Sequence, residues 1–77
     1  MSTLIFLTRD RCPLCDEALP WVEARAGRQG HLLTVIDVDT DPGLRERFGD
    51  RVPVVLRDGE EVLAGRFSER EVRGALG

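Results

Sequence analysis

The stretch Cys12-Pro13-Leu14-Cys15 is the most informative part of this sequence. It comes shortly after the apolar run Leu4-Ile5-Phe6-Leu7, and a helix-like segment follows it from Asp16. Two thiols separated by two residues, where a strand gives way to a helix, are able to close into a disulfide and to reopen. No other cysteine is present, so the spacing indicates thiol–disulfide exchange by this pair alone.

Other uses of the two thiols compete with redox chemistry. A structural disulfide here closes a very short loop, so it stabilises the fold by well under the ~3 kcal/mol of a roughly 15-residue loop. A structural zinc site needs four ligands, whereas the chain offers two thiols and one imidazole, that of His31. Two alternatives stay open: inert buried thiols, and metal or cluster ligands pooled between two chains.

The composition limits the class of protein. Seventy-seven residues, 42% of them hydrophobic, predict one folded domain spanning residues 1–77. The formal charge of −3, without a basic stripe interleaved with aromatic residues, argues against a nucleic-acid partner. Nothing in the pattern suggests an obligate assembly, so a monomer is expected.

The pattern also bears on the cellular compartment. No stretch approaches the ~20 apolar residues of a membrane helix, so no membrane association is expected. The run Leu4–Leu7 is too short for the core of a signal peptide, and no cleavage-like site of small residues follows it. The expected compartment is therefore the cytoplasm, where thiols are kept reduced and a catalytic disulfide is favoured over a structural one.

The first half of the chain predicts a strand, a helix and a strand. A short β-prone run covers Thr3–Leu7, and a helix runs from Cys12 to about Ala26, with Gly27 as its stop. Leu32–Val38 is apolar on both faces and is expected to be a central strand. Pro20 is expected to kink the helix. The predicted core face of the helix consists of Cys15, Ala18, Leu19, Val22 and Ala26.

The second half predicts a short helix, a hairpin and a last helix. Asp41-Pro42 opens a helix that ends near Gly49. Val54–Arg57 and Glu60–Leu63 flank Asp58-Gly59, a two-residue hairpin signal. The last helix starts at Ser68, where Ser68 and Glu71 form a capping box and Phe67 and Val72 have the spacing of a hydrophobic staple. The predicted order is βαβαββα, an α/β fold with the Cys12–Cys15 pair at the carboxyl ends of the strands.

With its elements in this order, the chain resembles the thioredoxin-fold superfamily, and within it the short bacterial glutaredoxin-like proteins. Three segments carry the resemblance: the block from Thr8 to Ala18 around the cysteines, the strand end Ile36-Asp37-Val38-Asp39, and Arg51-Val52-Pro53-Val54. The resemblance implies a glutaredoxin-type, four-stranded mixed sheet with flanking helices.

The resemblance also implies roles for individual residues. Cys12 takes the role of the nucleophile and Cys15 that of the resolving thiol. Val52 and Pro53 fall on the family's substrate-docking backbone and its cis-proline. Arg9 falls where glutaredoxins carry a basic residue that meets a glutathione carboxylate. The implied substrate-binding positions are Arg9, Pro13, Leu14, Arg51, Val52, Pro53, Gly65 and Ser68.

Some of these positions depart from the glutaredoxin pattern. Leu14 stands where tyrosine is usual, and Arg51 replaces the threonine before Val52-Pro53. Ala64-Gly65 replaces a Gly-Gly pair, and Ser68 takes the place of a glutathione-contacting aspartate. These changes weaken the implied glutathione site.

The predicted function is therefore that of a thiol–disulfide oxidoreductase acting on protein or glutathione mixed disulfides. No bound cofactor or resident metal is expected, and glutathione is the candidate co-substrate.

The start of a helix and the nearby Arg9 and Arg11 are expected to lower the pKa of Cys12, whereas Asp16 opposes them. Arg51 is expected to face the cysteine pair, and His31 to be a solvent-facing loop residue. The competing hypothesis is a thioredoxin-fold docking module whose cysteines are idle or regulatory.

Overall fold

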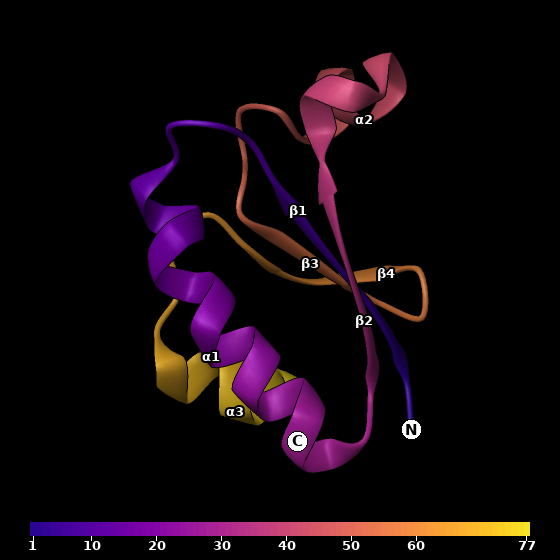
Figure 1. Cartoon of the computed structure of the whole chain (residues 1–77), viewed down its shortest axis with the longest axis vertical. Helices are drawn as coiled ribbons and strands as arrows, with labels where there is room; N and C mark the ends of the chain where they lie inside the picture. The colour runs from indigo at the N-terminus through magenta and orange to yellow at the C-terminus, as the bar shows by residue number, and fades with distance from the viewer.

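Strands and helices alternate along the chain in the predicted order, with one extra 3-10 turn. The computed structural model describes all residues from Met1 to Gly77. Two helices, α1 and α3, lie together beside the sheet, and α2 sits at the opposite end of the molecule (Figure 1). The elements are β1 (Thr3–Thr8), α1 (Pro13–Gln29), β2 (Leu32–Asp37), η1 (Val38–Thr40), α2 (Pro42–Phe48), β3 (Val54–Arg57), β4 (Glu60–Ala64) and α3 (Glu69–Leu76). The predicted α/β class with a four-stranded mixed sheet is confirmed.

The strand order in the sheet is β2-β1-β3-β4, which corrects one expectation. The segment Leu32–Val38 was expected to be central, but β2 is an edge strand that pairs only with β1, in parallel. β1 takes the centre because it also pairs antiparallel with β3. Apolar residues on both faces of β2 do not imply central burial, since Leu32 is 61% exposed and Val35 is 45% exposed.

The end of α1 is a second correction. The helix does not stop at Gly27 but continues to Gln29, and Gly30 follows it in the left-handed conformation with φ of 73°. The N–H of Gly30 bonds to the carbonyl of Ala26, which satisfies a carbonyl at the helix end. Gly27 fits inside the helix, whereas the left-handed φ at Gly30 is one that favours glycine.

The structure confirms the other predicted helix caps and the predicted hairpin turn. Asp41 caps α2, with its carboxylate accepting from the N–H groups of Gly43 and Leu44. The capping box of Ser68 and Glu71 is present at the start of α3. The hairpin turn between β3 and β4 has positive φ at both Asp58 and Gly59, as a type I′ turn requires.

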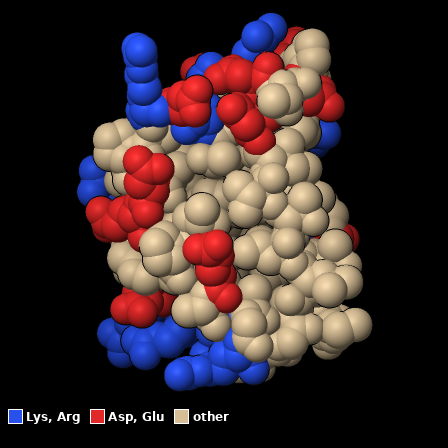
Figure 2. Space-filling view, in the orientation of Figure 1, with Lys and Arg blue, Asp and Glu red and all other residues tan.

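Charged side chains gather over α2 and around the ends of α1 and α3, whereas the face over β2 is largely uncharged (Figure 2). None of the helices combines the length and the apolar character needed to cross a membrane.

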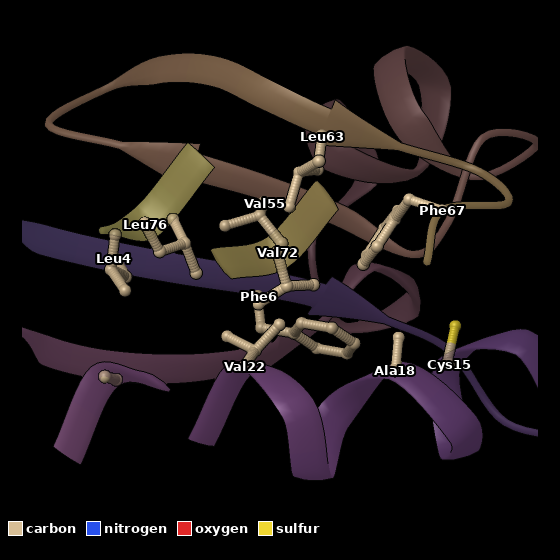
Figure 3. Packing of buried hydrophobic residues seen from close by; sticks show 11 residues of the cluster. Leu4, Phe6, Cys15, Ala18, Val22, Val55, Leu63, Phe67, Val72 and Leu76 are labelled. Atoms are coloured by element: carbon tan, nitrogen blue, oxygen red, sulfur yellow. The ribbon is translucent and has the colours of Figure 1, made fainter. Parts of the chain in front are cut away.

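Two buried clusters pack on opposite faces of the sheet. On the face covered by α1 and α3, Phe6 of β1 packs with Val22 of α1 and Val72 of α3, as Figure 3 shows. On the other face, Leu7 packs with Phe48 of α2. Adjacent residues Phe6 and Leu7 point to opposite faces because side chains alternate along a strand. The predicted core face of α1 is confirmed, with Leu19 partly buried and the other four residues fully buried.

His31 is not the solvent-facing loop residue that was expected. Its Nδ1 accepts a hydrogen bond from the backbone N–H of Ser2 at 2.9 Å. Its Nε2 lies 2.8 Å from the carbonyl oxygen of Leu76 and donates to it, because that oxygen can only accept. The imidazole therefore joins the start of β1 to the end of α3. This role depends on two segments far apart in sequence, so spacing alone did not indicate it.

We expect His31→Ala to lower the free energy of unfolding by about 1–3 kcal/mol, because it leaves both backbone groups without their partner. Urea denaturation followed by circular dichroism measures the change. Gln29→Ala, at an exposed position nearby, is the control. A loss no larger than that of the control would contradict the bridging role.

Asp58 in the hairpin turn holds the start of β1. Its Oδ1 accepts from the N–H of Thr3 at 2.9 Å. This hydrogen bond, with smaller contributions from Ser2 and Arg57, lowers the pKa of Asp58 below the usual aspartate value. Its contribution to stability is therefore complete above the unfolded-state pKa and is lost as the pH falls through the lower folded-state pKa.

We expect the stability of the wild type to fall more steeply than that of Asp58→Asn as the pH drops below about 4. Asparagine retains the acceptor oxygen and tolerates positive φ, but it cannot be protonated in this range. Urea midpoints measured at several pH values test this, with Asp50→Asn as the control. Parallel pH profiles for the wild type and Asp58→Asn would contradict the assignment.

Candidate functional site

The two cysteines lie at the first turn of α1 and are joined by a disulfide, with their Cα atoms 5.2 Å apart. Cys12 is the N-cap, and its Sγ accepts from the N–H of Cys15 at 3.1 Å. Pro13 occupies the first helical position, where a missing N–H costs nothing. Arg11 precedes the cap with φ of 57°, a left-handed conformation that turns the chain sharply from β1 into α1.

The two sulfurs differ in exposure. Cys12 is half-buried, whereas Cys15 is only 1% exposed. Figure 3 shows Cys15 at the end of the core on α1, one turn from Ala18, and Phe67 belongs to the same cluster. Cys12 is therefore the sulfur that an external molecule can reach.

The local electrostatics favour a thiolate at Cys12 once the disulfide is reduced. The first N–H groups of a helix have no partner inside the helix, and its N-terminal end carries a partial positive charge. The N–H of Cys15 already points at the Cys12 sulfur. Asp16 in the first turn opposes the anion.

The segment before β3 is the second part of the site. The peptide bond between Val52 and Pro53 is cis, and Pro53 is fully buried. Val52 is half-buried and packs against both core clusters. Gly65 fastens this segment to the end of β4, because its N–H bonds to the carbonyls of Arg51 at 3.0 Å and Pro53 at 2.8 Å.

Arg9, expected near the substrate, is engaged within the protein. Its guanidinium bonds to both carboxylate oxygens of Asp39, at 2.8 and 3.2 Å, and to the carbonyl of Gly49 at 3.0 Å. The hydrogen bond with Asp39 and the charge of that carboxylate raise the pKa of Arg9. The guanidinium thus ties the end of β1 to the segments on either side of α2.

Arg51 does not face the cysteine pair, which corrects the expectation for this residue. Its guanidinium pairs with Glu61 of β4 and lies 5.9 Å from the centre of the Phe48 ring. Phe48 belongs to the cluster on the α2 face of the sheet, whereas Cys15 belongs to the cluster on the opposite face. The direction of this side chain follows its ion-pair partner on β4, which lies ten residues further along the chain.

Ser68 lies beside an open groove, but its hydroxyl is already engaged. Its Oγ accepts from the N–H of Glu71 at 3.1 Å and contacts the Glu71 carboxylate at 3.2 Å. The groove has a volume of about 510 Å³. Its lining residues are Glu17, Trp21, Arg66, Phe67, Ser68, Glu69 and Glu71. Three carboxylates against one guanidinium make it acidic.

Pro13 and Leu14, which were also expected at the site, differ in how exposed their side chains are. Pro13 is exposed and Leu14 is half-buried at the start of α1, so both lie beside the disulfide. Glu17, Trp21 and Glu69 were not expected in the site. Their positions in the groove depend on how α1 and α3 pack, and no sequence motif marked them.

The side chains that are able to bind a metal ion do not form a cluster in the structure. The structure holds no group of three or more histidine, cysteine, aspartate or glutamate side chains placed to bind one metal ion. The alternative in which two chains pool their thiols is a property of an assembly and stays a separate hypothesis.

Comparison with known proteins identifies relatives along the whole chain. The sequence model of a family described as "Glutaredoxin-like domain (DUF836)" matches residues 3–77. Uncharacterised proteins of Mycobacterium tuberculosis and Mycobacterium bovis are 38% identical over 75 residues, which covers 91% of this chain and 77% of each relative.

Solved structures support the same relationship. A structural genomics target protein from X. campestris superimposes with a TM-score of 0.77 at 35% identity, covering 95% of this chain and 93% of that one. Thioredoxin 1 from Thermosipho africanus superimposes with a TM-score of 0.73 at 25% identity, covering 96% and 89%. The fold is therefore thioredoxin-like, and the disulfide within it supports a redox-type function.

After reduction, we expect iodoacetamide at neutral pH to modify Cys12 well before Cys15, because Cys15 is buried in the core. Peptide mass spectrometry at successive times measures the order. Unfolding in urea is the control and is expected to remove the difference. Faster modification of Cys15 in the folded protein would contradict the assignment of Cys12 as the accessible thiol.

Proposed function

Because the chain belongs to the glutaredoxin-like domain family, we propose that it is a thiol–disulfide oxidoreductase with Cys12 as nucleophile. The observation that carries the proposal is the Cys12–Cys15 disulfide at the start of α1, with one sulfur accessible and the other buried. A pair of this kind suits catalysis, since the accessible sulfur attacks the substrate disulfide and the buried one then attacks the mixed disulfide that forms.

The reaction balances in two steps. In the reduced protein, the thiolate of Cys12 attacks one sulfur of a substrate disulfide, and the other substrate sulfur leaves as a thiolate. The Cys15 thiol then loses its proton to solvent and attacks Cys12, which releases the first substrate sulfur. The substrate gains two electrons and becomes two thiols, while Cys12 and Cys15 become a disulfide. An external thiol or dithiol reductant returns the protein to its reduced form.

The backbone at Val52-Pro53 is the proposed docking element for the substrate chain. This role follows from the family resemblance and is supported by the packing of the segment. The bonds from the Gly65 N–H hold its backbone in place. A fixed backbone costs less ordering on binding than a mobile one, so it suits the recognition of an extended substrate segment.

We propose a disulfide on a basic protein segment as the preferred substrate, with glutathione disulfide as the poorer one. Glutathione carries two carboxylates, and arginine is the side chain best suited to bind them. Arg9 and Arg51, the two expected cations, are engaged with Asp39 and Glu61. The groove beside Phe67 is acidic, which favours a cationic partner and repels an anionic one.

We expect Cys15→Ser to accumulate a stable mixed disulfide on Cys12, because the resolving thiol is absent. Cys12→Ser is expected to form none and to lose substrate turnover. Intact mass spectrometry of the reduced variants, incubated with a disulfide-linked arginine-rich peptide or with glutathione disulfide, measures the adducts. The peptide adduct is expected to form several times faster than the glutathione adduct.

Each result separates the hypotheses. If a variant with both cysteines changed to serine still replaces the wild type in cells that lack the protein, a docking module is favoured over an enzyme. Faster reaction with glutathione disulfide than with the basic peptide would retain the enzyme but contradict the proposed substrate preference. A disulfide-linked glutamate-rich peptide of the same length is the matched control for charge.

A further inference from the structure

A second cleft lies between α1 and α3, and arginines dominate its lining. The cleft has a volume of about 170 Å³. Arg25 and Arg28 come from α1, and Arg73 comes from α3. Trp21, Ala24 and Glu69 complete the lining, and these six residues are called the arginine cleft.

The helical spacing of the residues explains why they meet. Trp21, Arg25 and Arg28 recur at intervals of four and three along α1, so they lie on one face of that helix. Glu69 and Arg73 are four apart on α3, which packs against α1. Figure 2 shows basic side chains gathered at this end of the molecule, over the C-terminal half of α1 and over α3.

None of the three guanidinium groups forms an ion pair with a carboxylate of the protein. The two ion pairs of the structure are Arg9–Asp39 and Arg51–Glu61, and neither involves the arginine cleft. Three cations against the single carboxylate of Glu69 leave an excess of two positive charges. Like charges held close together destabilise a fold, and a bound anion removes that cost.

Arg25 of the arginine cleft has few bonds to the rest of the protein. The Nε of Arg25 is buried and has no hydrogen-bond partner in the structure. A buried donor of this kind is rare in folded proteins, because losing its bond to water without replacement destabilises the folded state. The half-buried Arg25 side chain therefore has hydrogen-bonding capacity that the protein itself leaves unused.

We propose that the arginine cleft binds a phosphate group, either as the free ion or as part of a small phosphorylated molecule. A dianionic phosphate matches the excess of two positive charges. Its tetrahedral oxygens accept from arginines that approach from two helices, and guanidinium groups form charge-assisted bonds to phosphate. The arginine cleft adjoins the acidic groove, with which it shares Trp21 and Glu69, but its arginines lie away from the disulfide. Arg25 and Arg28 lie in the C-terminal half of α1, and the disulfide lies at its start.

The single tryptophan of the chain gives a direct measurement. Trp21 lines the arginine cleft, and no tyrosine interferes with its fluorescence. Inorganic phosphate is titrated into the protein at constant ionic strength, with sodium chloride as the balancing salt, and the melting temperature is recorded in the same samples. We expect a saturable fluorescence change and a rise in melting temperature with phosphate, and neither with chloride.

Matched variants decide whether the cleft is responsible. Arg25→Gln with Arg73→Gln is expected to weaken phosphate binding at least tenfold. Arg45→Gln with Arg70→Gln removes the same two charges from exposed positions outside the cleft and is expected to change binding less than twofold. If the first pair does not fold, Arg28→Gln alone, at an exposed position, is expected to weaken binding several-fold.

The outcomes are distinct. ADP binding tighter than phosphate indicates a phosphorylated organic ligand, and equal binding indicates the free ion; both support the site. Equal losses in the two pairs of variants would show non-specific attraction to a basic surface and overturn it. A phosphate response no larger than that of chloride, in both fluorescence and melting temperature, would also overturn it. None of these results depends on the activity of Cys12.

Discussion

The packing of α1 against the two central strands is the constraint on which the rest of the structure depends. Val22 and Ala18 on the buried face of α1 meet Phe6 of β1 and Val55 of β3 in one cluster. Fully burying a side chain of the size of valine or phenylalanine stabilises a fold by about 1.5–3 kcal/mol, so the position of this helix on the sheet is firmly fixed. Because Cys15 belongs to the same face, the packing buries it and leaves Cys12 at the helix start, where it is accessible.

The arginines discussed above fall into two groups, those bonded to other parts of the protein and those without a partner in it. Arg9 and Arg51 form the two ion pairs, and Arg57 bonds to the hydroxyl of Ser2 at 3.0 Å and the carbonyl of Ala75 at 2.7 Å. These three side chains connect separate elements of the fold and are therefore poorly placed to bind a substrate as well. The unpaired guanidinium groups of the arginine cleft have no such structural partner, which is why a ligand is proposed there and not at Arg9.

The sequence predicted most elements because their signals are local. The caps at Asp41 and Ser68, the turn at Asp58-Gly59 and the apolar face of α1 each involve residues of one short, continuous segment. Two errors had different causes. The end of α1 was misplaced because two glycines three residues apart, Gly27 and Gly30, both resemble a helix stop, and only Gly30 adopts the left-handed conformation. The central position was assigned to β2 because its apolar sequence does not show that β3, from a distant segment, pairs with the other edge of β1.

The sequence by itself determined that two cysteines with this spacing stand at a strand-to-helix junction, together with the order of elements that carries them. Both are properties of neighbouring residues and of hydrophobic periodicity. Only the tertiary structure decided which charged side chains remain available. Arg51 turns toward Glu61, His31 joins Ser2 to Leu76, and three arginines meet between α1 and α3. Long polar side chains find their partners across elements, and those partners exist only once the core has brought the elements together.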